Sequence, residues 1–306
     1  MSVPGQQPLS SQFDDALVGT SLAGGGPADE GRTARKEQLR LLARSKTFIA
    51  GAIIVGFWVF CAIFGELLVD DPLASDPIND LAAPSADHWF GTDRLGRDVF
   101  SRVIAGAEGI LITAPLATLL GTVLGTALGL VTGYFRGLVD DVLSRIIDAF
   151  LALPIVIVCL LAIVALGPSK ITLIVVIGVV FAPIIARTVR AAVLTERELD
   201  YVAAARLRNE RTPYVLFGEI LPNVMGPVMV EFTVRLGYAV FAIATLTFLG
   251  FGLQPPAPDW GLQVYEHYGL ISGGFWWPVL FPALAITTLV IGVNLLADGV
   301  AEAFGR

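Results

Sequence analysis

The chain has 306 residues, of which 55% are hydrophobic and 15% charged, and its net charge is −7. Soluble domains carry about 25% charged residues, so this composition excludes an ordinary water-facing surface and indicates an all-α, polytopic membrane bundle. The negative charge, without a basic patch interleaved with aromatics, argues against a nucleic-acid partner. The sequence has no phosphate-binding loop, no serine-nucleophile elbow and no metal-ligand spacing. We therefore expect no catalytic residues, no metal and no cofactor bound by the chain itself.

The N-terminal part divides into three predicted segments. Residues 1–46 are rich in Ser, Gly, Gln and Pro at their start, which is typical of a largely disordered tail. Residues 47–70 contain an apolar run long enough to span about 30 Å of hydrocarbon, the first transmembrane helix. Residues 71–109 form an Asp- and Pro-rich loop with a short amphipathic stretch, in which Val103 and Arg102 lie on opposite sides. That stretch predicts an interfacial helix.

Residues 110–306 contain five further apolar runs, so the chain as a whole is predicted to have six transmembrane helices. The runs are Ile110–Tyr134, Ile146–Leu166, Ile171–Ala186, Val228–Leu253 and Pro278–Ala297. In the first of these, glycine recurs every fourth residue from Gly121 to Gly133. Small residues at that spacing let two helix backbones approach closely, so we expect a packing stripe inside the bundle.

The distribution of Lys and Arg predicts the orientation in the membrane, because cations mark the cytoplasmic side. Cations gather before the first run and in the segment 187–223, whereas the opposite loops hold only Arg94, Arg97, Arg102 and Lys170. Both termini are therefore expected in the cytoplasm. Trp260, Trp276 and Trp277 are expected in an outer aromatic belt.

The inner segment 187–223 is long for a simple connection. Within it, Asp200-Tyr-Val-Ala-Ala-Ala-Arg-Leu-Arg208 predicts a short helix with an acidic start and a basic end. Asn209 is expected to end this helix, since asparagine tolerates the left-handed conformation. The small alanine face permits a partner's groove to close around the helix. A solvated surface helix without a function is the alternative reading of these residues.

Four segments resemble a known family. The helix above, followed by Ile220-Leu-Pro-Asn223, is similar to the "EAA" loop of permease subunits of bacterial ATP-binding-cassette importers. His88-Trp-Phe-Gly-Thr-Asp93 with Gly96-Arg-Asp98 resembles a signature of C-type dipeptide and oligopeptide permeases. The segments 248–261 and 294–299 resemble two more. The likeness covers about residues 45–300, with four motifs in the right order.

This resemblance implies a type I importer permease fold in a bacterial cell membrane. It implies a homologous B-type permease as partner, two cytoplasmic ATP-binding subunits that hold ATP and Mg, and an extracytoplasmic substrate-binding protein that delivers peptide. The segment 187–223 then becomes a coupling loop to the ATPases. The residues expected to make that coupling are Asp200, Tyr201, Ala204, Ala205, Arg206, Asn209, Leu221 and Pro222. The chain departs from the family pattern at Ala203, Asn209 and Ile243, where Glu, Gly and Glu are usual.

Ionisable and amide side chains inside the runs are candidates for the translocation path or its gate. Glu231 and Arg235 are four residues apart, so they share a helix face and can pair. Asp148 and Asn294 are the other candidates. For each of these residues a structural role, such as a bridge to a neighbouring helix, remains the alternative.

The function indicated is the membrane-spanning permease of an ATP-driven importer of dipeptides or oligopeptides. A nickel complex, glutathione or haem is an alternative cargo within the same family. An ion-coupled secondary carrier is a further alternative, although such carriers usually contain inverted repeats and none is visible here.

Overall fold

The computed structural model of this chain describes residues 45–304, so the predicted disordered tail lies outside the described residues except for its last two positions. The long helices are α3 (Lys46–Leu68), α4 (Val99–Tyr134), α7 (Lys170–Glu196), α10 (Leu221–Phe248) and α12 (Trp277–Phe304). The shorter helices are α5 (Leu138–Leu151), α6 (Ile155–Leu166), α8 (Asp200–Leu207), α9 (Thr212–Tyr214) and α11 (Trp260–His267). Across residues 45–304 there is no β-strand, only one isolated bridge between Thr92 and Asp98. The all-α prediction is confirmed.

The number of spans depends on one bent helix pair. Five helices in the described part of the chain are long and apolar enough to cross a membrane, and a sixth span results if α5 and α6 are counted together. These two helices meet at 89°. The run Ile146–Leu166, predicted as one span, is therefore broken. Pro154 precedes α6 and has no N–H to continue the ladder of α5, and each half, at about 1.5 Å per residue, is too short to cross alone.

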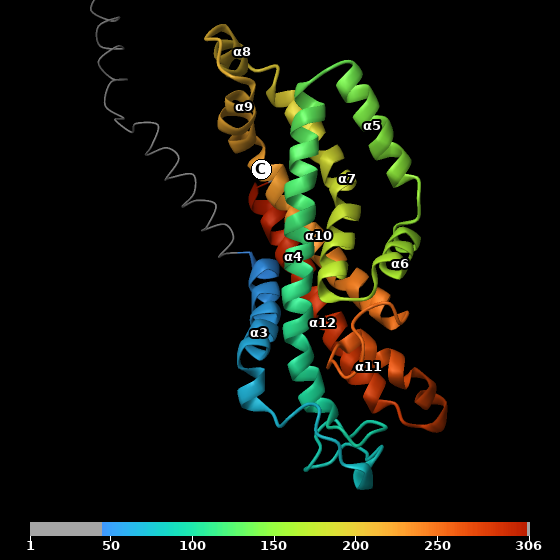
Figure 1. Ribbon diagram of the computed structural model, residues 1–306. Helices are drawn as coiled ribbons and strands as arrows, with labels where there is room; N and C mark the ends of the chain where they lie inside the picture. The colour runs from blue at the N-terminus through green and yellow to red at the C-terminus, as the bar shows by residue number, and fades with distance from the viewer. Residues whose placement is uncertain (1–44, 305–306) are drawn as a thin grey trace, which may run out of the picture.

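Helix α4 is the central element of the bundle (Figure 1). It packs most extensively against α7, through the predicted glycine stripe. A β-carbon added at Gly125 would lie 2.7 Å from the carbonyl oxygen of Ala182, and one at Gly129 would lie 2.8 Å from that of Ala186. The backbones of α4 and α7 touch at these positions, so only glycine fits. The prediction of a packing stripe is confirmed.

Helix α4 also begins earlier than predicted. Its 36 residues start at Val99, where the Asp98 side chain caps the helix by accepting from the backbone N–H of Ser101. The amphipathic stretch predicted as a separate interfacial helix is thus the first turns of a helix about 54 Å long. Arg102, placed by the pattern on a polar side, is only 1% exposed. The local pattern did not reveal that α11 and the preceding loop cover this helix face.

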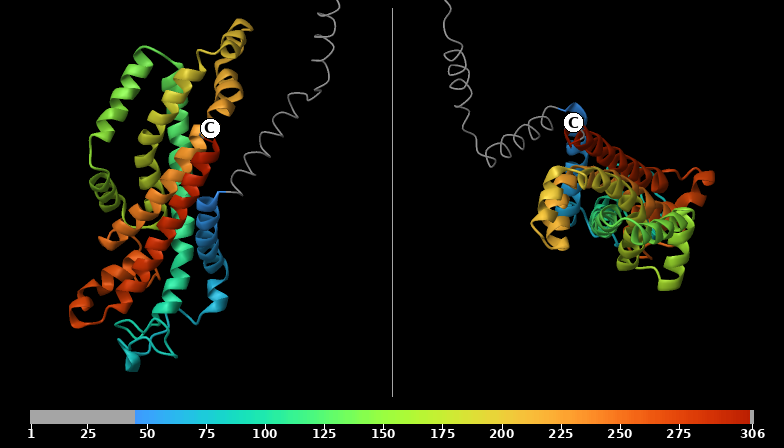
Figure 2. Two further views of the ribbon diagram at one scale, coloured as in Figure 1. Left: turned by 180° about the vertical axis from the view of Figure 1, so that it is seen from behind. Right: turned by 90° about the horizontal axis from the view of Figure 1, so that it is seen from above.

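The remaining long helices enclose α4 on one side. Helix α3 lies along α12, where Gly51 and Gly292 permit close contact, and α12 lies along α10. Helices α8 and α9 stand at one end of the molecule, the α8 end (Figures 1 and 2). The loop 70–98 and α11 stand at the opposite end, called the loop end here.

Candidate functional site

The segment between α7 and α10 projects from the α8 end of the bundle (Figure 1). Helix α8 starts at Asp200 and ends at Leu207, and Asn209 follows with a left-handed φ of 55°. The predicted helix and its asparagine stop are confirmed. Helix α7 runs on to Glu196, so only the residues after it form the projecting part of the predicted loop 187–223.

The faces of α8 differ in exposure. Ala205 and Val202 are fully buried against the chain itself, whereas Ala204 and Ala203 are exposed and Leu207 is 83% exposed. Ala205 was predicted to contact a partner together with Ala204, and that part of the prediction is wrong for this conformation. Ala205 shares the inward face with Val202, because residues three apart lie on the same side of a helix. Ala203 and Ala204 lie on the outward side.

Two side chains of α8 fix it to the ends of the long helices. The Tyr201 hydroxyl donates to a Glu196 carboxylate oxygen at 2.7 Å, and the Asn223 side chain interacts with the same hydroxyl. Burial and the contact with Glu196 raise the pKa of Tyr201 to about 12, so its proton remains available for donation. The Arg206 guanidinium lies 4.9 Å from the centre of the Tyr134 ring, at the last residue of α4. Helix α8 is therefore held to α4, α7 and α10.

The predicted pair in α10 is formed and has a third member. Arg235 Nε donates to a Glu231 carboxylate oxygen at 2.9 Å, and the Thr188 hydroxyl of α7 donates to the other oxygen at 2.9 Å. The guanidinium also lies 5.2 Å from the centre of the exposed Tyr238 ring. Both ionised side chains are mostly buried, at 17% and 14% exposed. Ionisable groups at this depth avoid lipid and face protein or water.

Asp148 and Asn294 extend this arrangement to the neighbouring helices. Asp148 of α5 forms an ion pair with Arg187 of α7, the residue next to Thr188. Asn294 of α12 lies against Gly237 of α10, where an added β-carbon would be 2.4 Å from its side-chain oxygen. The four predicted path residues thus lie along a row from α5 through α7 and α10 to α12, which we call the polar belt. Its members are Asp148, Arg187, Thr188, Glu231, Arg235 and Asn294.

A buried ion cluster at the loop end explains the motif around Asp93. Asp93 accepts from Arg97 Nε at 2.6 Å and from the backbone N–H groups of Leu95 and Arg97. Arg102 lies 3.8 Å from carboxylate oxygens of both Asp93 and Glu266. His267 Nε2 lies 3.9 Å from Asp93, and burial lowers the pKa of this histidine. Together these groups join the loop 70–98, α4 and α11 into one unit.

The motif at 248–261 packs onto the same unit. Trp260 Nε1 donates to the Val103 carbonyl oxygen at 2.7 Å, and Trp277 Nε1 donates to that of Thr92 at 3.0 Å. Both tryptophans are buried, at 1% and 7% exposed. The prediction that they belong to an outer aromatic belt is wrong, because their indole N–H groups satisfy backbone carbonyls inside the protein. Only Trp276 of the three is exposed, at 47%.

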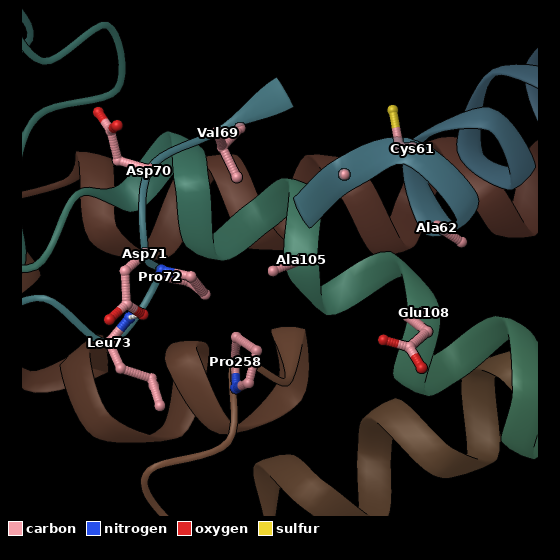
Figure 3. Close-up of a pocket in the computed structure, with 11 residues that line it drawn as sticks. Cys61, Ala62, Val69, Asp70, Asp71, Pro72, Leu73, Ala105, Glu108 and Pro258 are labelled. Carbon is pink, nitrogen blue, oxygen red and sulfur yellow. Dashed lines mark hydrogen bonds between the residues drawn. The ribbon is translucent and has the colours of Figure 1, made fainter. Parts of the chain in front are cut away.

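A cavity of about 550 Å³ lies beside this unit, between α3, α4 and the turn after α3 (Figure 3). Asp70, Asp71 and Glu108 place carboxylates on its wall, and the rest of the lining is mostly apolar. None of the polar-belt residues lines it. In the described part of the chain, no group of three His, Cys, Asp or Glu side chains is placed to hold a metal ion.

Sequence reasoning missed the partners of the predicted residues. The contacts of Thr188, Glu196 and Asn223 could not be predicted from spacing along the chain, because each side chain acts on a residue in another helix. The ion cluster did have a sequence signal, because two glycines, Gly91 and Gly96, flank Asp93. In the structure their φ angles are 73° and 69°, values that favour glycine and that form a constrained turn.

Comparisons with known proteins agree with this architecture. The family described as binding-protein-dependent transport system inner membrane component matches residues 125–306. The chain is 37% identical over 269 residues to the dipeptide transport system permease protein DppC of Alkalihalophilus pseudofirmus, covering 88% of each. It is 36% identical over 282 residues to the glutathione transport system permease protein GsiD of Salmonella paratyphi A, covering 90% of this chain and 91% of that one.

Among solved structures, the inward-facing MetNI methionine ABC transporter has a chain of the same fold. The TM-score is 0.55 at 22% sequence identity, and the match covers 67% of this chain and 97% of that chain. This likeness confirms the predicted permease fold. Given the family match and the identity to its members, the chain belongs to the binding-protein-dependent transport system inner membrane components and is a multi-pass membrane permease subunit.

Proposed function

We propose that this chain forms half of the translocation path of an ATP-driven importer of dipeptides or oligopeptides. The other half is a homologous B-type permease, two cytoplasmic subunits hydrolyse ATP, and an extracytoplasmic binding protein delivers the peptide. The observation that carries this proposal is a helical bundle with a polar belt and a projecting α8, in a chain 37% identical to a dipeptide permease.

Helix α8 is proposed as the contact with an ATPase subunit. Its outward face consists of Ala203, Ala204 and Leu207, two small side chains beside one exposed leucine. A groove on the ATPase can close over such a face without displacing bulky groups. The inward face, with Ala205 and Val202, transmits the motion because it is packed against the chain's own helices.

The polar belt is proposed to line the path or its gate. Peptide amides need hydrogen-bond partners while they cross the membrane. Asn294 and the guanidinium N–H groups of Arg235 other than Nε supply them on neighbouring helices. The Glu231–Arg235 pair remains neutral overall, so it does not trap a charged cargo.

The α8 end is proposed to face the cytoplasm, with both termini on that side. The cations in and around α8, among them Arg197, Arg208 and Arg211, support this orientation. The start of α3 and the end of α12 both point toward the α8 end (Figure 1).

The test of this proposal uses the complete complex in vesicles, with ATP hydrolysis and peptide uptake measured together. We expect Ala204→Arg to abolish peptide-stimulated ATP hydrolysis and uptake, because a long cation blocks the closing groove. Ala86→Arg, an identical change at an exposed alanine of the loop end, is the matched control and should keep ATPase coupling. Normal uptake by the Ala204→Arg variant would contradict a coupling role for α8.

Glutathione is a second candidate cargo, favoured by the 36% identity to a glutathione permease. Glutathione contains two amide bonds, so the same polar belt suits it. Competition between labelled dipeptide and glutathione in the uptake assay distinguishes the two candidate cargoes. The compound that the importer carries should inhibit uptake of the other at the lower concentration.

A further inference from the structure

The segment that leads from α9 into α10 is not a regular α-helix. Residues Val215–Ile220 form a π-helical turn, in which the N–H of Leu221 bonds to the carbonyl oxygen of Leu216, five residues earlier. A π turn holds one residue more than the α-helix it interrupts, and such turns occur often at functional sites.

The Leu221-Pro222-Asn223 motif accounts for this turn. Pro222 has no N–H, so the α-helical ladder cannot pass through it unbroken. The Asn223 side chain instead donates to the Glu219 carbonyl oxygen at 2.7 Å. The irregular hydrogen bonding is therefore specified by two particular residues.

One side of the π turn is packed and the other is free. Val215 and Ile220 are at most 1% exposed, whereas Phe217 is 57% exposed and Gly218 is exposed. Helix α8 packs against this turn. A movement of α8 therefore acts on the π turn directly, and the free side gives the turn room to rearrange.

Tyr201 connects α8 with the end of α7 and the start of α10. Its hydroxyl donates to Glu196 at the last residue of α7, and Asn223 at the start of α10 interacts with the same hydroxyl. The same asparagine bonds the Glu219 carbonyl inside the turn. One side chain of α8 thus contacts both long helices and the residue that stabilises the irregular turn.

We propose that the π turn 215–220, with Tyr201 and Asn223 as positioning residues, is the joint that converts displacement of α8 into movement of α10. When a π turn shifts along a helix by one residue, the residue it passes turns by about 100° and advances by about 1.5 Å. A shift toward α10 therefore turns the first residue of α10 relative to the rest of that helix, without breaking the helix. This inference rests on the proposed coupling function of α8.

The first test is Tyr201→Phe in the complete complex, reconstituted with ATP and a dipeptide. This variant removes only the hydroxyl. We expect the yield of assembled complex to be unchanged and the peptide imported per ATP hydrolysed to fall at least threefold. The matched control is Tyr214→Phe, nearby in the same segment, whose hydroxyl makes no hydrogen bond to the residues that the structure describes. An unchanged ratio in the Tyr201→Phe complex overturns the proposal.

The second test measures the geometry itself. Spin labels at Glu210, just after α8, and at Met229 of α10, both exposed, report their separation with and without trapped ATP. We expect two separations in the otherwise unaltered complex, and one in a complex from which Gly218, an exposed residue of the turn, is deleted. Two separations after the deletion overturn the proposal, and if that variant does not assemble, the Tyr201→Phe ratio decides. Failure of the unaltered complex to couple ATP hydrolysis to uptake would instead overturn the proposed function.

Discussion

At the scale of single residues, the buried arginines of the loop end and of α10 lie beside carboxylates. Arg97 and Arg102 share Asp93 and Glu266 at the loop end, and Arg235 pairs with Glu231 in α10. A charge without a partner is costly inside a protein or membrane. Removing one member of such a pair is therefore expected to do more damage than removing both.

The pair in the polar belt provides a direct prediction. Arg235→Ala leaves Glu231 with Thr188 as its remaining partner, and should destabilise the protein by about 1–2 kcal/mol, since both side chains are partly exposed. The double variant Glu231→Ala with Arg235→Ala should recover part of this loss. Thermal unfolding of the purified complexes measures the difference.

Assembly and uptake, compared in the same variants, separate a path residue from a scaffold residue. We expect Arg235→Ala to slow peptide uptake while the amount of intact complex stays the same. Uptake that falls only in proportion to lost complex would assign the pair to the scaffold.

At the scale of helices, the α4–α7 contact is determined by glycine, and the α5–α6 break by proline. The four glycines of the stripe, Gly121 to Gly133, meet backbone carbonyls of α7, so their replacement cannot be absorbed by turning a side chain. Asp148 in the last turn of α5 pairs with Arg187 of α7, and Asp140 in the first turn of α5 pairs with Arg190 of α7. Ion pairs therefore contribute to holding α5 beside α7.

The glycine stripe gives a prediction with a control in the same helix. Gly125→Ala should destabilise the protein by about 1–3 kcal/mol, because the new β-carbon would lie 2.7 Å from backbone and side-chain atoms of α7. Gly109→Ala, with nothing within 4 Å of the added carbon, should be neutral or stabilising by up to about 1 kcal/mol. Equal unfolding temperatures for the two variants would show that α4 and α7 separate easily.

At the scale of the whole molecule, the two ends differ in construction. The α8 end carries a projecting segment with exposed cations and a small outward face. At the loop end, the loop 70–98, α4 and α11 are joined by one ion cluster and by the hydrogen bonds of Trp260 and Trp277. This difference suits an α8 end that moves against partners and a loop end that keeps its shape.

The proposed orientation is tested by labelling single cysteines in intact cells. A membrane-impermeant thiol reagent should label Asp80→Cys in the loop 70–98 and Ile271→Cys in the turn that follows α11, both exposed, and should not label Arg208→Cys. The native Cys61 and Cys159 are buried and give a low background. Labelling at position 208 in unbroken cells would place the α8 end outside and reject the orientation.

Several features could be predicted because they depend on nearby residues only. The apolar runs, the glycine stripe, the helix starting at Asp200 and its end at Asn209 follow from hydropathy, spacing and backbone preference. The Glu231–Arg235 pair follows from its four-residue spacing. Each of these signals lies within a few turns of one helix, where the geometry is known before the fold is.

Other features were decided only by the tertiary structure. Burial of Arg102 and Trp260 depends on α4 and α11 lying together, although more than 150 residues separate them. The burial of Ala205 depends on the packing of α8 against the turn at 215–220, and the position of α5 beside α7 depends on ion pairs between these two helices. The sequence by itself therefore determined the apolar runs, their order and the family. Which faces pack inward, and which charges pair between helices, was decided by contacts between distant segments that no local pattern contains.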